Sequence, residues 1–453
     1  MSICSDTSCL LTQEARALLT RLERVQPFAL HMPMVPAAAI SPLALTAIEN
    51  YLARGRRELR TRVEQFLAWL HSPTGRRATP AEAQRRFTFL RLRFNAVLAQ
   101  FDIFADVLNQ RSEHDTGVWL AGLDVVARDA LTLPERYYET PPVICYLDRG
   151  IGAAIRRART RLPGGGKNPA AIVRVPRERM VGSGIASSLV HEVGHQGASL
   201  LDLVNSLRPV LQAEQRRGGN AQTAWQFWER WISEIVADFW SVARVGIAST
   251  LGLIGVVSLP RAFVFRVSLD DPHPIPWIRV KLSCAMGQAL YPHRQWNDLA
   301  RRWESFYPLT GLVEGRRNLM TLLESTMPSF VAMLINHCPP LLRGKALIEA
   351  MAVDERQPAQ LAAYYEAWRR SPAAMRTASP ALVFAVIGQA RADGKISPET
   401  ESRFLAAMLK DWALRNTLNT SAICAKQQSI PLLRPSRLSL NPNIMSSKED
   451  FYG

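Results

Sequence analysis

The chain has 453 residues, of which 47% are hydrophobic and 21% are charged. This composition excludes a disordered or collagen-like chain, and the length is sufficient for two or three domains with their own cores. The chain is strongly basic, because 55 Lys and Arg residues against 39 Asp and Glu residues give a formal net charge of +16. Such a charge suits nucleic acid, an anionic membrane surface or an acidic partner, and does not choose among them.

Arginine carries most of the positive charge, in clusters at residues 54–62, 76–93 and 156–161. The clusters lie inside helical patterns, where the arginine stem also covers apolar surface. We interpret them mainly as solvated helix faces and keep binding of nucleic acid or an acidic partner as the alternative.

The cysteines, the N-terminus and the apolar segments indicate in which cellular compartment the protein is expected. None of the six cysteines belongs to a CxxC pair, which predicts buried free thiols in a reducing compartment. The N-terminus has no basic segment followed by an apolar one, so no secretory signal is expected. The most apolar stretch, residues 245–260, is shorter than the roughly 20 residues that span a bilayer. It predicts a buried helix end and turn, with a re-entrant or interfacial segment as the alternative. We therefore expect a cytoplasmic protein with no stable membrane span.

In chain order, residues 12–133 have a helical pattern, with helix starts at Ser41 and Thr79, each followed by proline. Next comes a small α+β unit that consists of a short apolar run at 143–147, a short helix at 151–162 and a strand at 170–175.

Two long helices are predicted at 183–211 and 223–245, and the chain is again helical from 275 to about 414, with breaks near three proline positions. The expected fold is mainly α (α+β), with a small zincin-like core between helical regions. We place its parts as follows: a helical N-terminal region at 1–138, the metallopeptidase core at 139–287, a helical C-terminal region at 288–425 and a disordered tail at 426–453.

The segment that carries chemistry is His191-Glu192-Val193-Gly194-His195. On a helix, positions i and i+4 face the same side, so His191 and His195 can bind one tetrahedral metal while Glu192 points toward an activated water. A catalytic zinc needs a third protein ligand. The third histidine of the HExxHxxGxxH motif is absent, because Leu201 stands in its place, so a carboxylate must supply this ligand.

The second long helix offers Glu234 and Asp238, four residues apart among apolar neighbours. Acidic side chains on so apolar a helix are costly unless they bind a metal or accept hydrogen bonds. We predict that Glu234 is the third zinc ligand and that Asp238 holds one ligand histidine by its other ring nitrogen.

These two motifs, His191 to His195 and Ser233-Glu234-Ile235-Val236-Ala237-Asp238, resemble the gluzincin metallopeptidases, whose second motif is ExxxD. Residues 271–280, DPHPIPWIRV, resemble the HPP…R segment of the CAAX-protease and HtpX-type gluzincins, although Ile275 stands where that family has its second proline. The likeness covers about residues 170–280 and does not extend to that family's transmembrane helices.

The resemblance implies zinc-assisted hydrolysis of a peptide bond in a protein or peptide substrate, with Glu192 as the general base. It makes His273 and Arg279 candidates for stabilising the charge on the reacting oxygen, with Tyr291 as an outside candidate. The competing interpretations are a loop histidine packed between prolines for His273 and, for Arg279, a salt bridge to Asp270 or Asp271. Strand 170–175 stands where gluzincins have the edge strand that pairs with substrate; a structural strand that binds no ligand is the alternative.

A second, short likeness lies near the C-terminus, where residues 390–409 resemble the helical TerB-like module; an ordinary capped helical hairpin is the alternative. Two alternative functions remain beside that of a peptidase. One is a helical scaffold that binds a partner and has a structural or relict metal site, and the other is a protein that binds nucleic acid or an acidic partner through its arginines.

Overall fold

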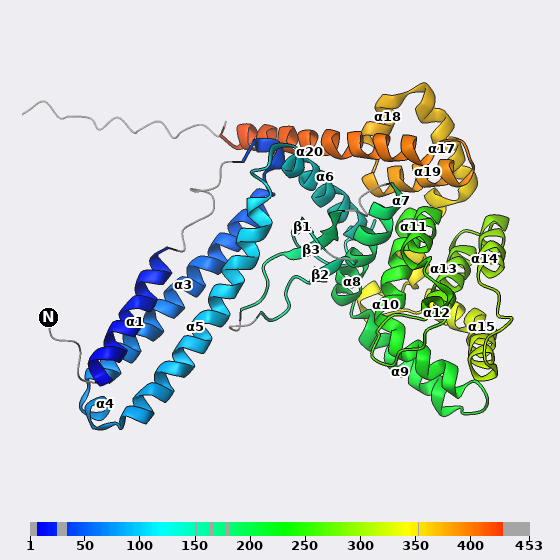
Figure 1. Ribbon diagram of the computed structural model, residues 1–453. Helices are drawn as coiled ribbons and strands as arrows, with labels where there is room; N and C mark the ends of the chain where they lie inside the picture. The colour runs from blue at the N-terminus through cyan, green and yellow to red at the C-terminus, as the bar shows by residue number, and fades with distance from the viewer. Residues whose placement is uncertain are drawn as a thin grey trace, which may run out of the picture.

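The computed structural model describes residues 7–24, 34–149, 152–162, 166–177, 182–351 and 353–428. Within these residues the fold is mainly helical with one small sheet, which confirms the predicted fold class. A long helical arm, a central sheet and a larger helical body follow one another in Figure 1. Of the predicted disordered tail, residues 429–453 lie outside the described residues, and residues 426–428 form the end of the last helix.

The arm consists of helices that pack along one another over a core of their own (Figure 1). Both predicted helix starts are confirmed: Ser41 Oγ accepts from the amide of Ala44 at 3.2 Å, and Thr79 forms a capping box with Glu82. The helices of the arm are α1 (Thr7–Glu23), the short η1 (Pro36–Ala38), α3 (Pro42–His71), α4 (Pro73–Arg77) and α5 (Pro80–Asn109).

Next come α6 (His114–Leu131) and a sheet of three strands in the order β1-β3-β2, namely β1 (Val143–Asp148), β3 (Ala171–Pro176) and β2 (Ala154–Arg156). β3 pairs parallel with β1 and antiparallel with β2. Alternate side chains of β1 and β3 belong to different cores: Ile144 and Ile172 join the core of the arm, whereas Cys145 and Val173 join that of the body. The sheet therefore links the two cores.

Two predictions about this unit were wrong. The segment 151–162, expected to be helical, contains β2 and a bridge between Arg161 and Lys167, because pairing with β3 satisfies backbone groups that a short isolated helix would leave exposed. The strand expected at the edge of the sheet, β3, is its central strand, because β2 occupies the side on which a substrate was expected.

The pattern at 183–211 forms two main helices rather than one, because the chain turns at Asp202, whose φ is +54°. A short π-helix precedes the first of them, and the second predicted helix is continuous. These elements are α7 (Ser183–Ile185), η3 (Ala186–Val190), α8 (His191–Leu200), α9 (Leu203–Arg216) and α10 (Gln222–Val245).

The apolar stretch 245–260 forms α11 (Ile247–Val257), most of which is buried, as the prediction of a buried helix end requires. The remaining helices confirm the breaks predicted near residues 308, 339 and 372. They are α12 (Arg261–Val264), α13 (Pro276–Leu290), α14 (Arg294–Phe306), α15 (Glu314–Ile335), η4 (Pro340–Leu342), α16 (Leu347–Ala350), η5 (Val353–Arg356), α17 (Pro358–Arg370), α18 (Pro372–Thr377), α19 (Pro380–Ala392) and α20 (Pro398–Gln428).

Among the described residues, one helix, α15, has the length and composition of a membrane span, and 33% of its most apolar window is buried. A core helix in a soluble protein meets the same criterion. The helices α19 and α20 form a helical hairpin near the C-terminus, in which Ser397 Oγ accepts from the amide of Thr400 at 3.3 Å and Gly394 in the turn has a φ of +71°. The resemblance to the TerB-like module stays a prediction.

The first helix of the body, α6, packs against the last helix of the chain, α20 (Figure 1). We assigned α6 to the N-terminal region 1–138, yet its buried side chains, such as Leu123 and Ala127, belong to the core of the body. The domain boundaries themselves stay predictions.

The prediction of buried free thiols is confirmed for two cysteines, is wrong about burial for a third and is wrong about the free thiol for a fourth. Cys145 and Cys284 are free and buried, and Cys338 is free but exposed. Cys9 is disulfide-bonded, which contradicts the prediction. It lies on an exposed face of α1, where no packing encloses the sulfur as it does at Cys145.

Candidate metal centre

The site depends on how closely α8 approaches α10. A Cβ atom added at Gly194 would lie 2.8 Å from the carbonyl oxygen of Ala237, and one added at Gly197 would lie 2.5 Å from the ring of Trp240. These contacts are below the usual van der Waals distance, so only glycine fits at either position. The two glycines of α8 face α10. Because the helices approach so closely there, the histidines of α8 can reach the Glu234 carboxylate of α10.

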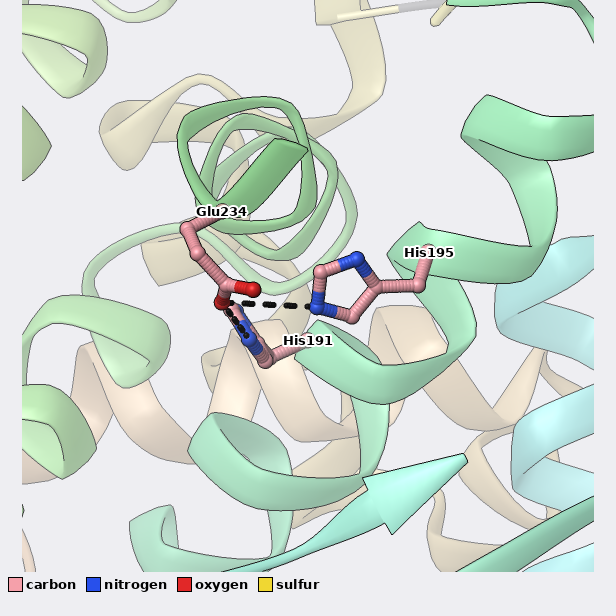
Figure 2. Close-up of side chains that lie close together, drawn as sticks. All are labelled: His191, His195 and Glu234. Atoms are coloured by element: carbon pink, nitrogen blue, oxygen red, sulfur yellow. Dashed lines mark ion pairs between the residues drawn. The ribbon is translucent and has the colours of Figure 1, made fainter. Parts of the chain in front are cut away.

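His191, His195 and Glu234 form a cluster whose ligand atoms all lie within 4.8 Å of one another. Nε2 of His191 is 3.2 Å and Nε2 of His195 is 3.4 Å from Oε2 of Glu234. In Figure 2 both imidazole rings point from α8 toward the Glu234 carboxylate on α10. His191 and Glu234 are buried and His195 is nearly so. The structure therefore brings together the three residues predicted as metal ligands.

The donor set fits a zinc ion. Zinc in proteins takes imidazole nitrogen and carboxylate oxygen in tetrahedral geometry at about 2.0–2.1 Å, and ligand atoms at the corners of such a tetrahedron lie about 3.3–3.4 Å apart. The two nitrogen–oxygen distances, 3.2 and 3.4 Å, have this size. Three protein donors leave one tetrahedral position for another molecule, which is the pattern of catalytic zinc sites.

Asp238 contacts His191 through the ring nitrogen that faces away from the cluster, as the sequence predicted. Its Oδ1 lies 2.8 Å from Nδ1 of His191. Because Nδ1 then carries the donated hydrogen, the lone pair of Nε2 faces the cluster. Burial alone would lower the pKa of His191, but the adjacent Asp238 and Glu234 raise it to about 9.

Arg279 belongs to the same network and contacts Asp238 rather than the two aspartates suggested by the sequence, Asp270 and Asp271. Its Nε donates to Oδ2 of Asp238 at 2.6 Å and its Nη2 donates to Oδ1 at 2.9 Å. Burial opposes ionisation of Asp238, but Arg279 and His191 more than compensate and lower the pKa of Asp238 below its usual range. The guanidinium therefore holds the carboxylate that holds His191, and it is a positioning residue in this geometry.

His273 reaches the site from the loop before α13. Its Nε2 lies 3.2 Å from Oε2 of Glu234, while its Nδ1 lies 2.7 Å from Oδ1 of Asp271. The backbone amide of His273 also donates to Asp271, at 3.0 Å. Hydrogen bonding to Glu234 raises the pKa of His273. His273 is not one of the three residues within 4.8 Å of one another, so it stands beside the cluster rather than in it.

Of the two remaining candidates, Glu192 lies next to the cluster, whereas the hydroxyl of Tyr291 is bound to the backbone of α10. Glu192 is buried on α8 one residue after His191, and burial raises its pKa, against the opposing effect of the two cluster histidines. A carboxyl group with a raised pKa, next to the ligands, suits a general base. The hydroxyl of Tyr291 donates to the carbonyl oxygen of Ala243 at 2.6 Å and is buried there. The outside candidate for charge stabilisation is therefore committed to the backbone of α10.

Sequence reasoning missed the roles of three residues of the site: the close helix approach at Gly194 and Gly197, and the contact of Asp271 with His273. The two glycines could have been noticed as a small-residue pair on one helix face, since Gly-x-x-Gly spacing permits close helix approach. The side chain of Asp271 contacts both the amide and Nδ1 of His273 two residues later, which is the local hydrogen bonding that aspartate favours before a turn.

No family model, no curated protein and no solved structure matches this chain.

Proposed function

We propose that this protein is a zinc-dependent metallopeptidase of the gluzincin type, which hydrolyses peptide bonds in a protein or peptide substrate. The observation that carries the proposal is the convergence of His191 and His195 on Glu234, with Asp238 behind His191. Two histidines of an HExxH helix, one carboxylate from a second helix and a supporting aspartate are the parts that this chemistry requires.

Zinc, when bound by His191, His195 and Glu234, would polarise the scissile carbonyl and lower the pKa of water, so that water could lose a proton and attack near neutral pH. The chain's own residues then handle the protons. Glu192 accepts the proton of the attacking water and returns it to the leaving amine, a role that its raised pKa favours.

The developing negative charge on the substrate oxygen needs a hydrogen-bond donor in addition to the metal. His273 is the best placed candidate, because its Nε2 is directed to the cluster and Asp271 fixes the ring through Nδ1. Arg279 supports the site indirectly, through Asp238 and His191.

The test uses the full-length protein, purified and loaded with zinc. We expect about one zinc ion per chain by elemental analysis and cleavage of a quenched fluorescent peptide library. Glu192→Gln removes the base but no ligand, so zinc content should persist while the cleavage rate falls by at least about a hundredfold. Glu64→Gln, the same change at an exposed position of the arm, is the control and should cleave like the unaltered protein.

The opposing function, a scaffold with a structural or relict metal site, predicts a different pattern. There Glu192→Gln changes no property of the protein, while His195→Asn unfolds the chain because metal binding contributes folding free energy. A purified protein that binds no zinc with all three ligands intact would refute both the peptidase and the structural zinc site.

A further inference from the structure

A second candidate site lies on the arm, away from the metal centre. A hollow of about 240 Å³ is lined by Arg56, Arg57 and Arg60 of α3, together with Ala53 of α3 and Leu22 near the end of α1. The four α3 positions follow the i, i+3, i+4, i+7 spacing of one helix face. Leu22 is buried, so the hollow has an apolar base and three guanidinium groups around it.

The three arginines have no acidic partner among the described residues, although acidic side chains are close in sequence. Glu58, which lies between Arg57 and Arg60 in the chain, pairs instead with Arg62 at 3.0 Å and with Arg93 of α5 at 2.8 Å. The carboxylate is thus directed toward α5 and forms its ion pairs with Arg62 and Arg93 rather than with the arginines that line the hollow. Three like charges around one concavity repel one another, and a bound anion would relieve that repulsion.

The size and chemistry of the hollow indicate a phosphate group. Its volume is below the roughly 300–1,000 Å³ of sites that enclose a whole small molecule, so it accommodates one or two phosphates rather than a complete nucleotide. Guanidinium groups match phosphate oxygens in pairs, which a lysine ammonium does not. The lining has no aromatic side chain on which a base could stack.

The surroundings favour a linear polyanion over a membrane surface. The described part of the arm, residues 7–24 and 34–109, carries 14 arginines and no lysine against eight acidic residues, which gives it a charge of +6. Of this charge, α3 carries +2, from five arginines against three glutamates, over 30 residues and therefore about 45 Å. The short helix α4 carries another +2, and the rest lies on α5 and at Arg24. The apolar residues of the hollow are the buried Leu22 and the small Ala53, and neither can insert into a bilayer.

We infer that the hollow of Arg56, Arg57 and Arg60 binds a phosphate of a nucleic-acid backbone, without regard to base sequence, and anchors a strand that follows the basic arm. This site is independent of the proposed peptidase function. The hollow gives the positive charge of the chain one specific binding site, formed by α3 and the end of α1. These two helices lie side by side in Figure 1.

The test measures fluorescence anisotropy of a fluorescein-labelled oligothymidylate with the full-length protein over a salt series. We expect binding that weakens with salt. Removing the three side chains together, in R56A/R57A/R60A, should weaken binding about ten- to a hundredfold and reduce the slope of log affinity against log salt by about 0.7–1.4, since the hollow holds one or two phosphates and each neutralised single-strand phosphate contributes about 0.7. Inorganic pyrophosphate should compete for the unaltered protein.

The matched control is R76A/R77A/R85A, which removes three exposed arginines of the same arm that do not line the hollow. It should weaken binding less than about threefold. An equal loss in both triple variants would mean that general charge, and not the hollow, is responsible, and would overturn the inference. Absence of oligonucleotide binding would overturn it too, as would sedimentation with phosphatidylglycerol vesicles that only R56A/R57A/R60A abolishes. Melting temperatures of both variants verify that α3 is intact.

Discussion

Asp238 joins three elements through one carboxylate. Its two oxygens accept from His191 on α8 and from both Nε and Nη2 of Arg279 on α13, while the aspartate itself stands on α10. The network is buried, and a buried carboxylate with three charge-assisted contacts is held far more rigidly than an exposed one. The orientation of His191 therefore depends, through Asp238, on Arg279, which is not a member of the cluster and, in our proposal, does not contact the substrate.

Arg279→Lys tests this dependence. Lysine keeps the charge but cannot donate two parallel hydrogen bonds to one carboxylate, so Asp238 loses its fixed orientation. We expect zinc affinity to fall about tenfold to a hundredfold, as is usual when the partner of a metal-bound histidine is disturbed. The measurement is a competition titration with a chromophoric zinc chelator.

Arg266→Lys, at an exposed position of the segment before α13, is the control and should bind zinc like the unaltered protein. If zinc affinity stayed constant in Arg279→Lys while the turnover number fell, Arg279 would act on the substrate directly, as the resemblance first implied, and the positioning role would be wrong.

At this scale the local part of the site could be predicted and the non-local part could not. Helical spacing places His191 beside His195 and Glu234 beside Asp238, because i and i+4 share a face whatever the rest of the fold does. The distance from His273 to Glu234 depends on the path of a loop, and its candidacy came from a resemblance. For Arg279, the sequence suggested nearby aspartates, whereas the actual partner lies 41 residues away in the chain.

At the scale of elements, the packing of α8 on α10 is what sets the geometry of the cluster. The backbone of α10 at Ala237 lies where the side chain of any residue but glycine would be at position 194. Backbone cannot move aside as the end of a flexible side chain can, so the distance between the helices is fixed to within a few tenths of an ångström.

Gly194→Ala should separate the helices. In an isolated helix alanine is about 1 kcal/mol more favourable than glycine, but overpacking against backbone costs about 1–3 kcal/mol. We therefore expect a lower melting temperature and, because His195 is adjacent, weaker zinc binding. Differential scanning calorimetry with and without zinc measures both effects.

The chain offers a matched control at Gly255 on α11, where an added Cβ has no atom within 4 Å. Gly255→Ala should leave zinc binding unchanged and keep or slightly raise the melting temperature. A Gly194→Ala protein as stable and as tight for zinc as the Gly255→Ala protein would show that α8 has room to shift.

The elements themselves were largely predictable, and the exceptions have physical causes. Caps at Ser41 and Thr79 are local signals, and the structure has both. The segment 151–162 has a helical composition, but the neighbouring strand β3 offers it backbone partners, and tertiary pairing overrides local preference. No local signal in β3 distinguishes a central from an edge strand, since that depends on whether β2 forms.

At the scale of the whole molecule, the body is closed by helices from opposite ends of the sequence. α6 and α20 approach so closely that a Cβ at Gly122 would lie 2.3 Å from the carbonyl oxygen of Leu409. Polar contacts join them as well, from Arg128 to Asn416 at 3.2 Å and from Lys410 to Asp115 at 3.3 Å. The core that holds the metal ligands is therefore one structure with the C-terminal helices.

A chain shortened after residue 396, which lacks α20, should fail to form the metal centre. The buried apolar residues of α20 are Leu405, Met408, Leu409, Trp412 and Ala413. Burial of a large apolar side chain contributes about 1.5–3 kcal/mol, so their loss is comparable with the roughly 5–15 kcal/mol that stabilises a folded domain. We expect aggregation or a low melting temperature, with less than stoichiometric zinc.

A chain that ends at residue 428 keeps every described element and is the control, with the melting temperature and zinc content of the full-length protein. Size-exclusion chromatography and elemental analysis compare the two. A monodisperse, zinc-loaded protein ending at residue 396 would show that the body does not need α20.

The pairing of α6 with α20 has a consequence for the order in which the protein folds during synthesis. Contacts such as that between Lys410 and Asp115 span 295 residues of chain. All the candidate ligands leave the ribosome before α20 is made, while the part of α6 that packs against α20 stays uncovered for most of translation, although β1 and α8 can already pack against other parts of this helix. Chains grow at about 5–20 residues per second, so this surface waits on the order of tens of seconds. The metal ligands can meet early, whereas closure of the body is among the last events of folding.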